Sequence, residues 1–183
     1  TLSAKKLYDI IRELPEGEIT LFTEENHWVV IKAGKSHFKM KGLSPDDFPS
    51  LPSLDDKKSF QLDEDLLQDL IKRTIFSCGE GDSRQILNGI WVGIINEGSK
   101  TKIRFVGTDG HRLSLAEKPI DPVSLGKNDE LRQMVIPKKA VMELRRLVEG
   151  KGKVKVFLMP NQIGFEIGPV LLFSRLLEGT YPN

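Results

Sequence analysis

Asp109 and His111 are the residues of this sequence whose types and spacing could support chemistry together. A carboxylate near an imidazole can serve acid–base catalysis, and both side chains can bind a metal ion. However, Asp109-Gly110 lies between two strand-like runs, where Asp-Gly is typical of a tight hairpin turn with positive φ. Such a turn breaks the geometry that would put both side chains on one strand face. We therefore expect no catalytic residue and no metal site; a hydrolase that uses this pair is the rival hypothesis.

Other common sites are not indicated. The runs Gly79-Glu80-Gly81 and Gly150-Lys151-Gly152 lack the glycine spacing of a P-loop or a Rossmann fingerprint, so we expect both to be turns. Cys78 is the only cysteine, which excludes an internal disulfide and any zinc site that needs several thiolates. This usage favours a reducing, cytoplasmic location. We expect no cofactor.

Composition and charge limit the classes of partner. The chain of 183 residues is 39% hydrophobic and 29% charged, as in ordinary globular proteins. Its 27 basic and 26 acidic residues leave a net charge of +1, so any contact with nucleic acid must be local. No apolar run approaches the roughly 20 residues that a spanning helix needs, so no membrane partner is expected. Because the chain begins at Thr1 inside an expected helix, we expect a piece of a longer protein.

Periodicity predicts three helices. Apolar residues with helical spacing indicate a helix over residues 3–14, a second that begins after Asp63, and a third over 137–148. The carboxylate of Asp63 is expected to cap the second helix, and Pro137 suits a first-turn position. Strands are expected at residues 18–23, 27–32, 36–41, 60–62, 86–95, 101–108, 112–117, 133–136, 153–158, 162–167 and 170–175.

Residues 3–49 and 136–182 form an internal repeat. With an offset of 133 residues, Lys5-Lys6 falls on Lys138-Lys139, and the exits Phe48-Pro49 and Tyr181-Pro182 meet. Both copies have a helix followed by three strands. The repeat predicts an α+β fold of strand-helix-three-strand units, with antiparallel sheets and the helices on one face.

The repeat also predicts how the chain is divided. Residues 1–50 are expected to be the second half of one domain, residues 51–59 a linker, and residues 60–183 a nearly whole second domain.

The hairpin run carries a resemblance to a known family. Thr108-Asp109-Gly110-His111-Arg112-Leu113, preceded by Arg84-Gln85-Ile86-Leu87-Asn88-Gly89, resembles the middle domain of the bacterial DNA sliding clamp, the beta subunit of the replicative polymerase. The resemblance covers the whole chain in order and implies the DNA-clamp fold. It implies a non-catalytic processivity factor whose full-length homodimer closes a ring around duplex DNA. A generic α+β module that binds peptides without encircling DNA is the alternative.

The resemblance further implies a groove for short linear motifs of the polymerase, the clamp loader and other clients. Its residues in this sequence would be Leu87, Gly89, Thr108, Gly110, His111, Arg112, Leu113 and Pro182. Apolar walls and exposed donors suit an extended peptide. From the residues alone, the hairpin would be read as a simple turn.

Double-stranded DNA would be contacted through its phosphates. The family pattern points to Lys5, Gly81, Gln85 and Ile86, and the recurrence of Lys-Lys in both repeats adds Lys138 and Lys139. Relatives often carry aromatic residues where this chain has Gln85-Ile86, so no stacking is expected there. Charged helix surfaces are common in proteins that bind no DNA, which is the competing interpretation of the lysines.

Overall fold

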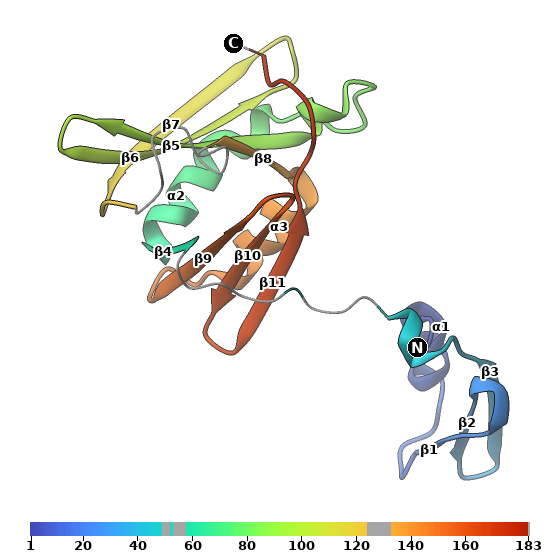
Figure 1. The fold of residues 1–183 in the computed structure, drawn as a ribbon. Coiled ribbons are helices and arrows are strands. Elements are labelled where there is room, and N and C mark those ends of the chain that lie inside the picture. Colours follow the sequence, from blue (N-terminus) through green and yellow to red (C-terminus); the bar gives the residue numbers. More distant parts are fainter. Residues whose placement is uncertain (49–51, 53–57, 124–132, 183) are drawn as a thin grey trace. The chain divides into compact units, whose positions relative to one another are not determined.

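The computed structural model describes residues 1–48, 52, 58–123 and 133–182, which form parts of two compact units, Thr1–Ser53 and Leu54–Asn183 (Figure 1). The first unit, unit 1, has one helix and an antiparallel sheet in the order β1-β2-β3. Its elements are α1 (Ala4–Arg12), β1 (Thr20–Thr23), β2 (Trp28–Ala33) and β3 (Ser36–Lys41).

Unit 1 has a small core. Val30, Ile31, Ala33 and Met40 are its buried hydrophobic side chains among the described residues, and no residue of α1 is buried. Ser3 caps α1, because its hydroxyl accepts a hydrogen bond from the amide of Lys6 at 3.5 Å. Within the described residues, β1 is an edge strand that pairs with β2 alone.

In its described residues the second unit, unit 2, has two α-helices and two antiparallel sheets of four strands, in the orders β11-β10-β9-β4 and β7-β6-β5-β8. Its elements are β4 (Ser59–Asp63), α2 (Glu64–Thr74), β5 (Gly89–Glu97), β6 (Lys100–Thr108), β7 (Leu113–Ile120), β8 (Gln133–Pro137), α3 (Lys138–Leu147), β9 (Lys153–Met159), β10 (Gln162–Ile167) and β11 (Val170–Arg175).

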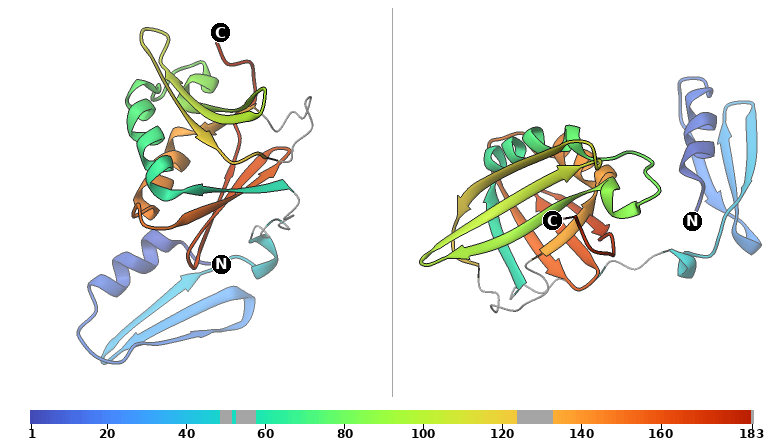
Figure 2. Two further views of the ribbon diagram at one scale, coloured as in Figure 1. Left: turned by 90° about the vertical axis from the view of Figure 1, so that its left-hand side faces the viewer. Right: turned by 90° about the horizontal axis from the view of Figure 1, so that it is seen from above.

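Each half of unit 2 lends its first strand to the sheet of the other half. β4 pairs with β9, and β8 pairs with β5, both antiparallel. α2 and α3 lie side by side on one side of the sheets (Figure 2), and both helices and both sheets contribute to one buried cluster. Neither half can therefore complete its sheet or its core without the other.

The structure confirms the repeat and the fold class. α1 followed by β1-β2-β3 has the same order and the same antiparallel pairing as α3 followed by β9-β10-β11. The strands begin and end close to the predicted residues because alternating apolar side chains mark them. β2 begins at Trp28 rather than at residue 27, since Asn26 and His27 have φ values of 54° and 61°, which no strand accepts.

Several local predictions were wrong. Pro137 ends β8 and is the N-cap residue of α3 rather than a first-turn residue. The Asp63 carboxylate makes no capping hydrogen bond, and the amide of Leu66, which a cap could have bonded, donates to the Asp65 carboxylate at 2.7 Å. The expected strand 86–95 begins only at Gly89, since Gln85–Asn88 forms a short 3-10 helix. There the Leu87 carbonyl accepts from the amide of Gly79 instead of a neighbouring strand.

The first residue of each helix in unit 2 reaches the loop that follows the other helix. Glu64, only 8% exposed, accepts hydrogen bonds from the amides of Glu149, Gly150 and Lys151 after α3, at 2.9, 2.9 and 3.3 Å. Lys138 opens α3, and its ammonium lies 2.8 Å from the carboxylate of Glu80 after α2. Opposite charges thus make equivalent links in the two halves.

Replacing Glu64 with Gln should destabilise unit 2 by about 1–3 kcal/mol, because an amide cannot accept from three backbone N–H groups as a carboxylate does. Urea denaturation followed by Trp91 fluorescence in a Trp28→Phe background would measure the loss. Glu149→Gln, which removes an exposed charge at the same loop, should change stability by less than about 0.5 kcal/mol. Equal stability of the two variants would contradict the role of Glu64.

Candidate functional site

The β6–β7 hairpin is held by its own side chains. Thr108 pairs with Leu113, so the loop comprises residues 109–112, one residue more than the predicted strands 101–108 and 112–117 leave between them. Gly110 has the expected positive φ of 85°. The Thr108 hydroxyl donates to the carbonyl of Arg112 at 2.7 Å and accepts from the amide of Gly110 at 3.1 Å. A longer loop forms because these bonds replace those of a tight turn.

Asp109 is the centre of this loop. Its carboxylate accepts from the amides of His111 and Arg112, each at 3.0 Å, and from Nε of Arg112 at 3.0 Å. The two backbone hydrogen bonds, with a smaller contribution from the Arg112 side chain, lower the pKa of Asp109 to about 2. Such a weak base does not suit proton abstraction near neutral pH, so the geometry favours a structural role for Asp109 over the hydrolase alternative.

A second loop, residues 79–88, lies next to the hairpin. Asn88 closes it: its side chain accepts from the amide of Asp82 at 3.0 Å and donates to the carbonyl of the same residue at 2.8 Å. Gly79 donates its amide to the Leu87 carbonyl at 2.9 Å. The loop is therefore bonded at both ends before any ligand arrives.

Arg84 connects the two loops. Its guanidinium forms an ion pair with Asp82 at 3.1 Å and donates to the Asp109 carbonyl at 3.3 Å. A Cβ at Gly110 would lie 2.8 Å from the same guanidinium, so glycine permits this close approach. Although Arg84 is part of the family motif, its type and position alone did not indicate this contact.

The chain after β11 returns to the same region. The amide of Leu177 donates to the Val135 carbonyl at 2.8 Å. A Cβ at Gly89 would lie only 2.8 Å from Cδ1 of Leu177, so the leucine side chain packs directly against the glycine. Tyr181 donates its hydroxyl to the carbonyl of Val106 at 3.1 Å. Burial raises the pKa of Tyr181 to about 12, so the phenol remains a donor. Tyr181 thus anchors the segment that ends in Pro182.

The residues expected in the peptide groove fall into two groups. Gly110, His111, Arg112, Leu113 and Pro182 are exposed, and the Leu113 side chain is the largest apolar one among them at 58% exposure. Leu87 and Thr108, at 1% and 5% exposure, are interior residues, and Gly89 is also buried. The structure therefore puts Leu87, Gly89 and Thr108 beneath the loops, where they support the exposed group.

The residues expected at DNA also differ in exposure. Lys5, Gly81, Gln85 and Lys139 are exposed, and Ile86 is half-buried. Lys138 is not a free cation: its side chain is 22% exposed, and its ammonium contacts Glu80 and the Cys78 carbonyl at 2.8 and 3.4 Å. The sequence could not indicate this ion pair, since its partners are separated by 58 residues.

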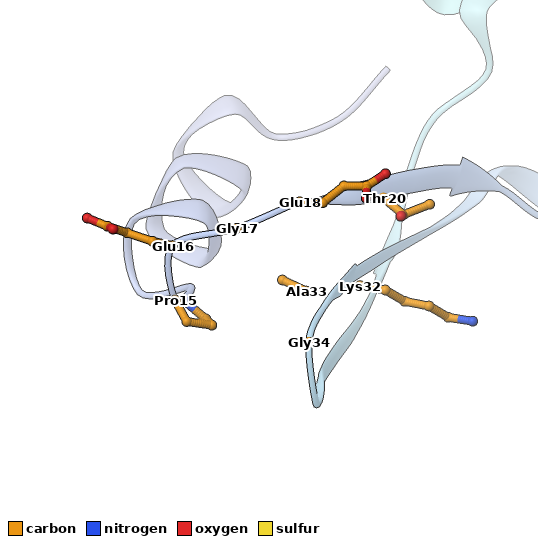
Figure 3. Close-up of a pocket in the computed structure, with 8 residues that line it drawn as sticks. All are labelled: Pro15, Glu16, Gly17, Glu18, Thr20, Lys32, Ala33 and Gly34. Atoms are coloured by element: carbon orange, nitrogen blue, oxygen red, sulfur yellow. The ribbon is translucent and has the colours of Figure 1, made fainter.

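A hollow of 450 Å³ lies in unit 1, between the end of α1 and the β2–β3 turn. Its polar side chains do not converge: in Figure 3 the Glu16 carboxylate and the Lys32 ammonium extend to opposite sides of the view. Such a lining does not suit a charged small ligand. In the described parts of both units, no three side chains among His, Cys, Asp and Glu are grouped to hold a metal ion. No described helix is long and apolar enough to cross a membrane.

Comparison with known protein families gives two matches in series. The profile of the DNA polymerase III beta subunit, N-terminal domain, matches residues 1–52. That of the DNA polymerase III beta subunit, central domain, matches residues 61–183.

Individual relatives come from the same family as the two matching profiles. The chain is 37% identical to the beta sliding clamp of Caulobacter vibrioides, over all of this chain and 49% of that protein, and 35% identical to that of Halalkalibacterium halodurans, over 99% and 46%. It spans about half the length of these curated relatives. The DNA polymerase sliding clamp of Caulobacter crescentus superposes with a TM-score of 0.77 at 35% identity, covering 100% of this chain and 49% of that one. The Bacillus subtilis clamp gives 0.77 at 30%, covering 100% and 46%.

The low pKa of Asp109 predicts how the hairpin responds to acid. Because the folded-state pKa is about 2 and the ordinary value is 3.8, the carboxylate stabilises the loop above pH ~4, and that stabilisation is lost as the pH falls toward 2. The Asp109 carboxyl carbon should titrate by NMR near pH 2, and nearer its ordinary value in Arg112→Ala. Titration of the unmodified protein near 3.8 would contradict the described hydrogen bonds.

Proposed function

The chain belongs to the family of the DNA polymerase III beta subunit, the sliding clamp, and we propose that its parent protein is a processivity factor that encircles duplex DNA. The observation that carries this proposal is the consecutive match of two domain profiles over one repeated fold. A closed ring cannot leave duplex DNA sideways, so tight chemical contacts are unnecessary. A ring of this kind does not require a strong positive charge, which agrees with the net charge of only +1 on this chain.

We propose that residues 1–50 are the second half of the first clamp domain, that residues 51–59 are a linker, and that residues 60–183 are the middle domain. The small core of unit 1 supports the first assignment. So does the outer edge of β1, which pairs with no strand among the described residues, whereas β9, its counterpart in unit 2, has β4 on that side. A strand equivalent to β4 would complete the sheet of unit 1. In this proposal the full-length protein is a homodimer.

The DNA contacts in this proposal are made by cations at the helix starts. Lys5 and Lys139 are exposed in the first turns of α1 and α3, and Gly81, Gln85 and Ile86 lie on the loop that leads into the Leu87-Asn88-Gly89 run. Lysines contact phosphates without reading bases, and each neutralised phosphate contributes about 0.9 to the salt dependence of binding. A few such contacts permit sliding.

The peptide groove is proposed at the two connected loops. Leu113 offers exposed apolar surface, and His111 and Arg112 offer donors for a peptide backbone or carboxylate. Their backbone amides are already bonded to Asp109, and Arg84 ties the hairpin to the neighbouring loop. Because little ordering remains to be done on binding, short motifs of the polymerase, clamp loader and other clients could bind with useful affinity.

The role proposed for the parent is that of an accessory subunit without a catalytic centre. The family assignment points to this role, and the bonds of Asp109 to backbone amides agree with it. A protein with this role in DNA replication would be located inside the cell.

The ring can be tested by topology. Full-length protein loaded onto a nicked circular duplex should remain bound during gel filtration, and cutting the circle once should release it, because a ring slides off a free end. Blocking both ends of the cut duplex with bound protein is the control and should restore retention. Retention that does not depend on DNA shape, or a monomeric parent in sedimentation, would favour the module that does not encircle DNA.

The groove can be tested by substitution. Leu113→Ala should weaken binding of a client's linear motif to the full-length protein by about 1–2 kcal/mol, because the exposed side chain would lose its contact with the motif's apolar residue. Calorimetry would measure the affinity. Leu171→Ala, which truncates another exposed leucine of unit 2, is the matched control and should have no effect. Unchanged affinity in Leu113→Ala would remove this residue from the groove.

A further inference from the structure

The pair of lysines at the start of α3 is electrostatically unequal. Lys139 is exposed and takes part in no ion pair described here, whereas the ammonium of Lys138 lies 2.8 Å from the carboxylate of Glu80. The side chain of Lys138 is 22% exposed and that of Glu80 is 85% exposed. The cation is therefore partly buried, and its anionic partner is the more exposed of the two.

Both ends of this ion pair belong to the candidate DNA interface. Glu80 immediately precedes Gly81, which is exposed and has open space where a Cβ would be. The Cys78 carbonyl also accepts from Lys138, at 3.4 Å, but a carbonyl carries no net charge and leaves the cation uncompensated. Glu80 is thus the group that neutralises Lys138. The hydrogen bond from Lys138 lowers the pKa of Glu80, so the carboxylate stays charged at neutral pH.

The Glu80 carboxylate presents negatively charged oxygen atoms to the Lys138 ammonium within hydrogen-bond distance. A DNA phosphate would make the same type of contact. Resting on the function proposed above, we propose that Glu80 occupies the phosphate position at Lys138 and withholds this lysine from DNA. Glu80 then sets the strength of the DNA contact. Of the two lysines Lys138 and Lys139, only Lys139 remains available to a phosphate. Weaker contact favours sliding.

The test is the salt dependence of binding between full-length protein and a fluorescently labelled linear duplex, at about 50 to 200 mM KCl. Glu80→Gln should bind more tightly, and the slope of log K against log salt should steepen by about 0.9, the value for one added phosphate contact. Lys138→Met should leave the slope unchanged in the wild-type background but should remove the added 0.9 in the Glu80→Gln background. If the Glu80–Lys138 ion pair had only a structural role, the effect of Lys138→Met on the slope would be the same with and without Glu80→Gln.

Two matched variants complete the design. Glu149→Gln removes an exposed negative charge at the other end of α3 and should leave the slope unchanged. Lys139→Met should reduce the slope by about 0.9 in both backgrounds, since Lys139 is exposed whether or not Glu80 is present. Thermal unfolding monitored by circular dichroism identifies any variant that fails to fold, and Glu80→Gln alone then decides the question.

The outcomes separate the two proposals. Salt-dependent binding by the wild type, with an unchanged slope in Glu80→Gln, would overturn this inference and leave the proposed function standing. This inference would also be overturned, with the proposed function left standing, if Lys138→Met reduced the slope of log K against log salt by about 0.9 in the wild-type background. Lys138 would then contact a phosphate despite Glu80. A full-length protein that binds no linear duplex at any salt concentration would also overturn this inference alone, because a closed ring is retained by topology. Failure to be retained on the nicked circular duplex would overturn the proposed function and this inference with it.

Discussion

Unit 2 depends on an exchange between its two halves. β4 completes the sheet of the second half, β8 completes that of the first, and each helix begins with a charged residue that reaches the loop after the other helix. On one side the carboxylate of Glu64 is buried among three amides, where water cannot replace it. On the other side Lys138 meets a carbonyl and a carboxylate near the surface. Because both links cross between the halves, loosening either half exposes the core of both.

The same exchange positions the candidate binding loops. β5 and β6 are held in the centre of their sheet by β8 and β7, so the loops at their ends start from fixed strands. Asp109 and Thr108 then bond the hairpin internally, Asn88 closes the neighbouring loop, and Arg84 joins the two. Loops held in this way need no reordering when a ligand binds, which suits the groove proposed above.

Most elements of the fold could be predicted because hydrophobic periodicity is local. The strand over residues 162–167 and the turn glycine Gly110 are examples in which the sequence pattern and the structure agree. Two of the wrong predictions share one cause, which is competition for a hydrogen-bonding group. The sequence predicts Asp63 as the cap of α2, but the Asp65 carboxylate accepts from the amide of Leu66. The predicted strand at residue 86 is replaced by a short helix where the amide of Gly79 donates to the carbonyl of Leu87. Residue types alone do not decide which of several possible partners forms such a hydrogen bond.

The candidate site divides in the same way. The sequence alone determined the order of elements, the repeat and the hairpin motif, since each depends on residue types at short spacing. Tertiary structure alone decided that Leu87 is interior, that Arg84 bridges two loops, and that Lys138 is paired while Lys139 is exposed. The reason is physical: exposure and charge compensation depend on groups brought together by folding, and neighbouring lysines with the same sequence environment can end in different electrostatic surroundings.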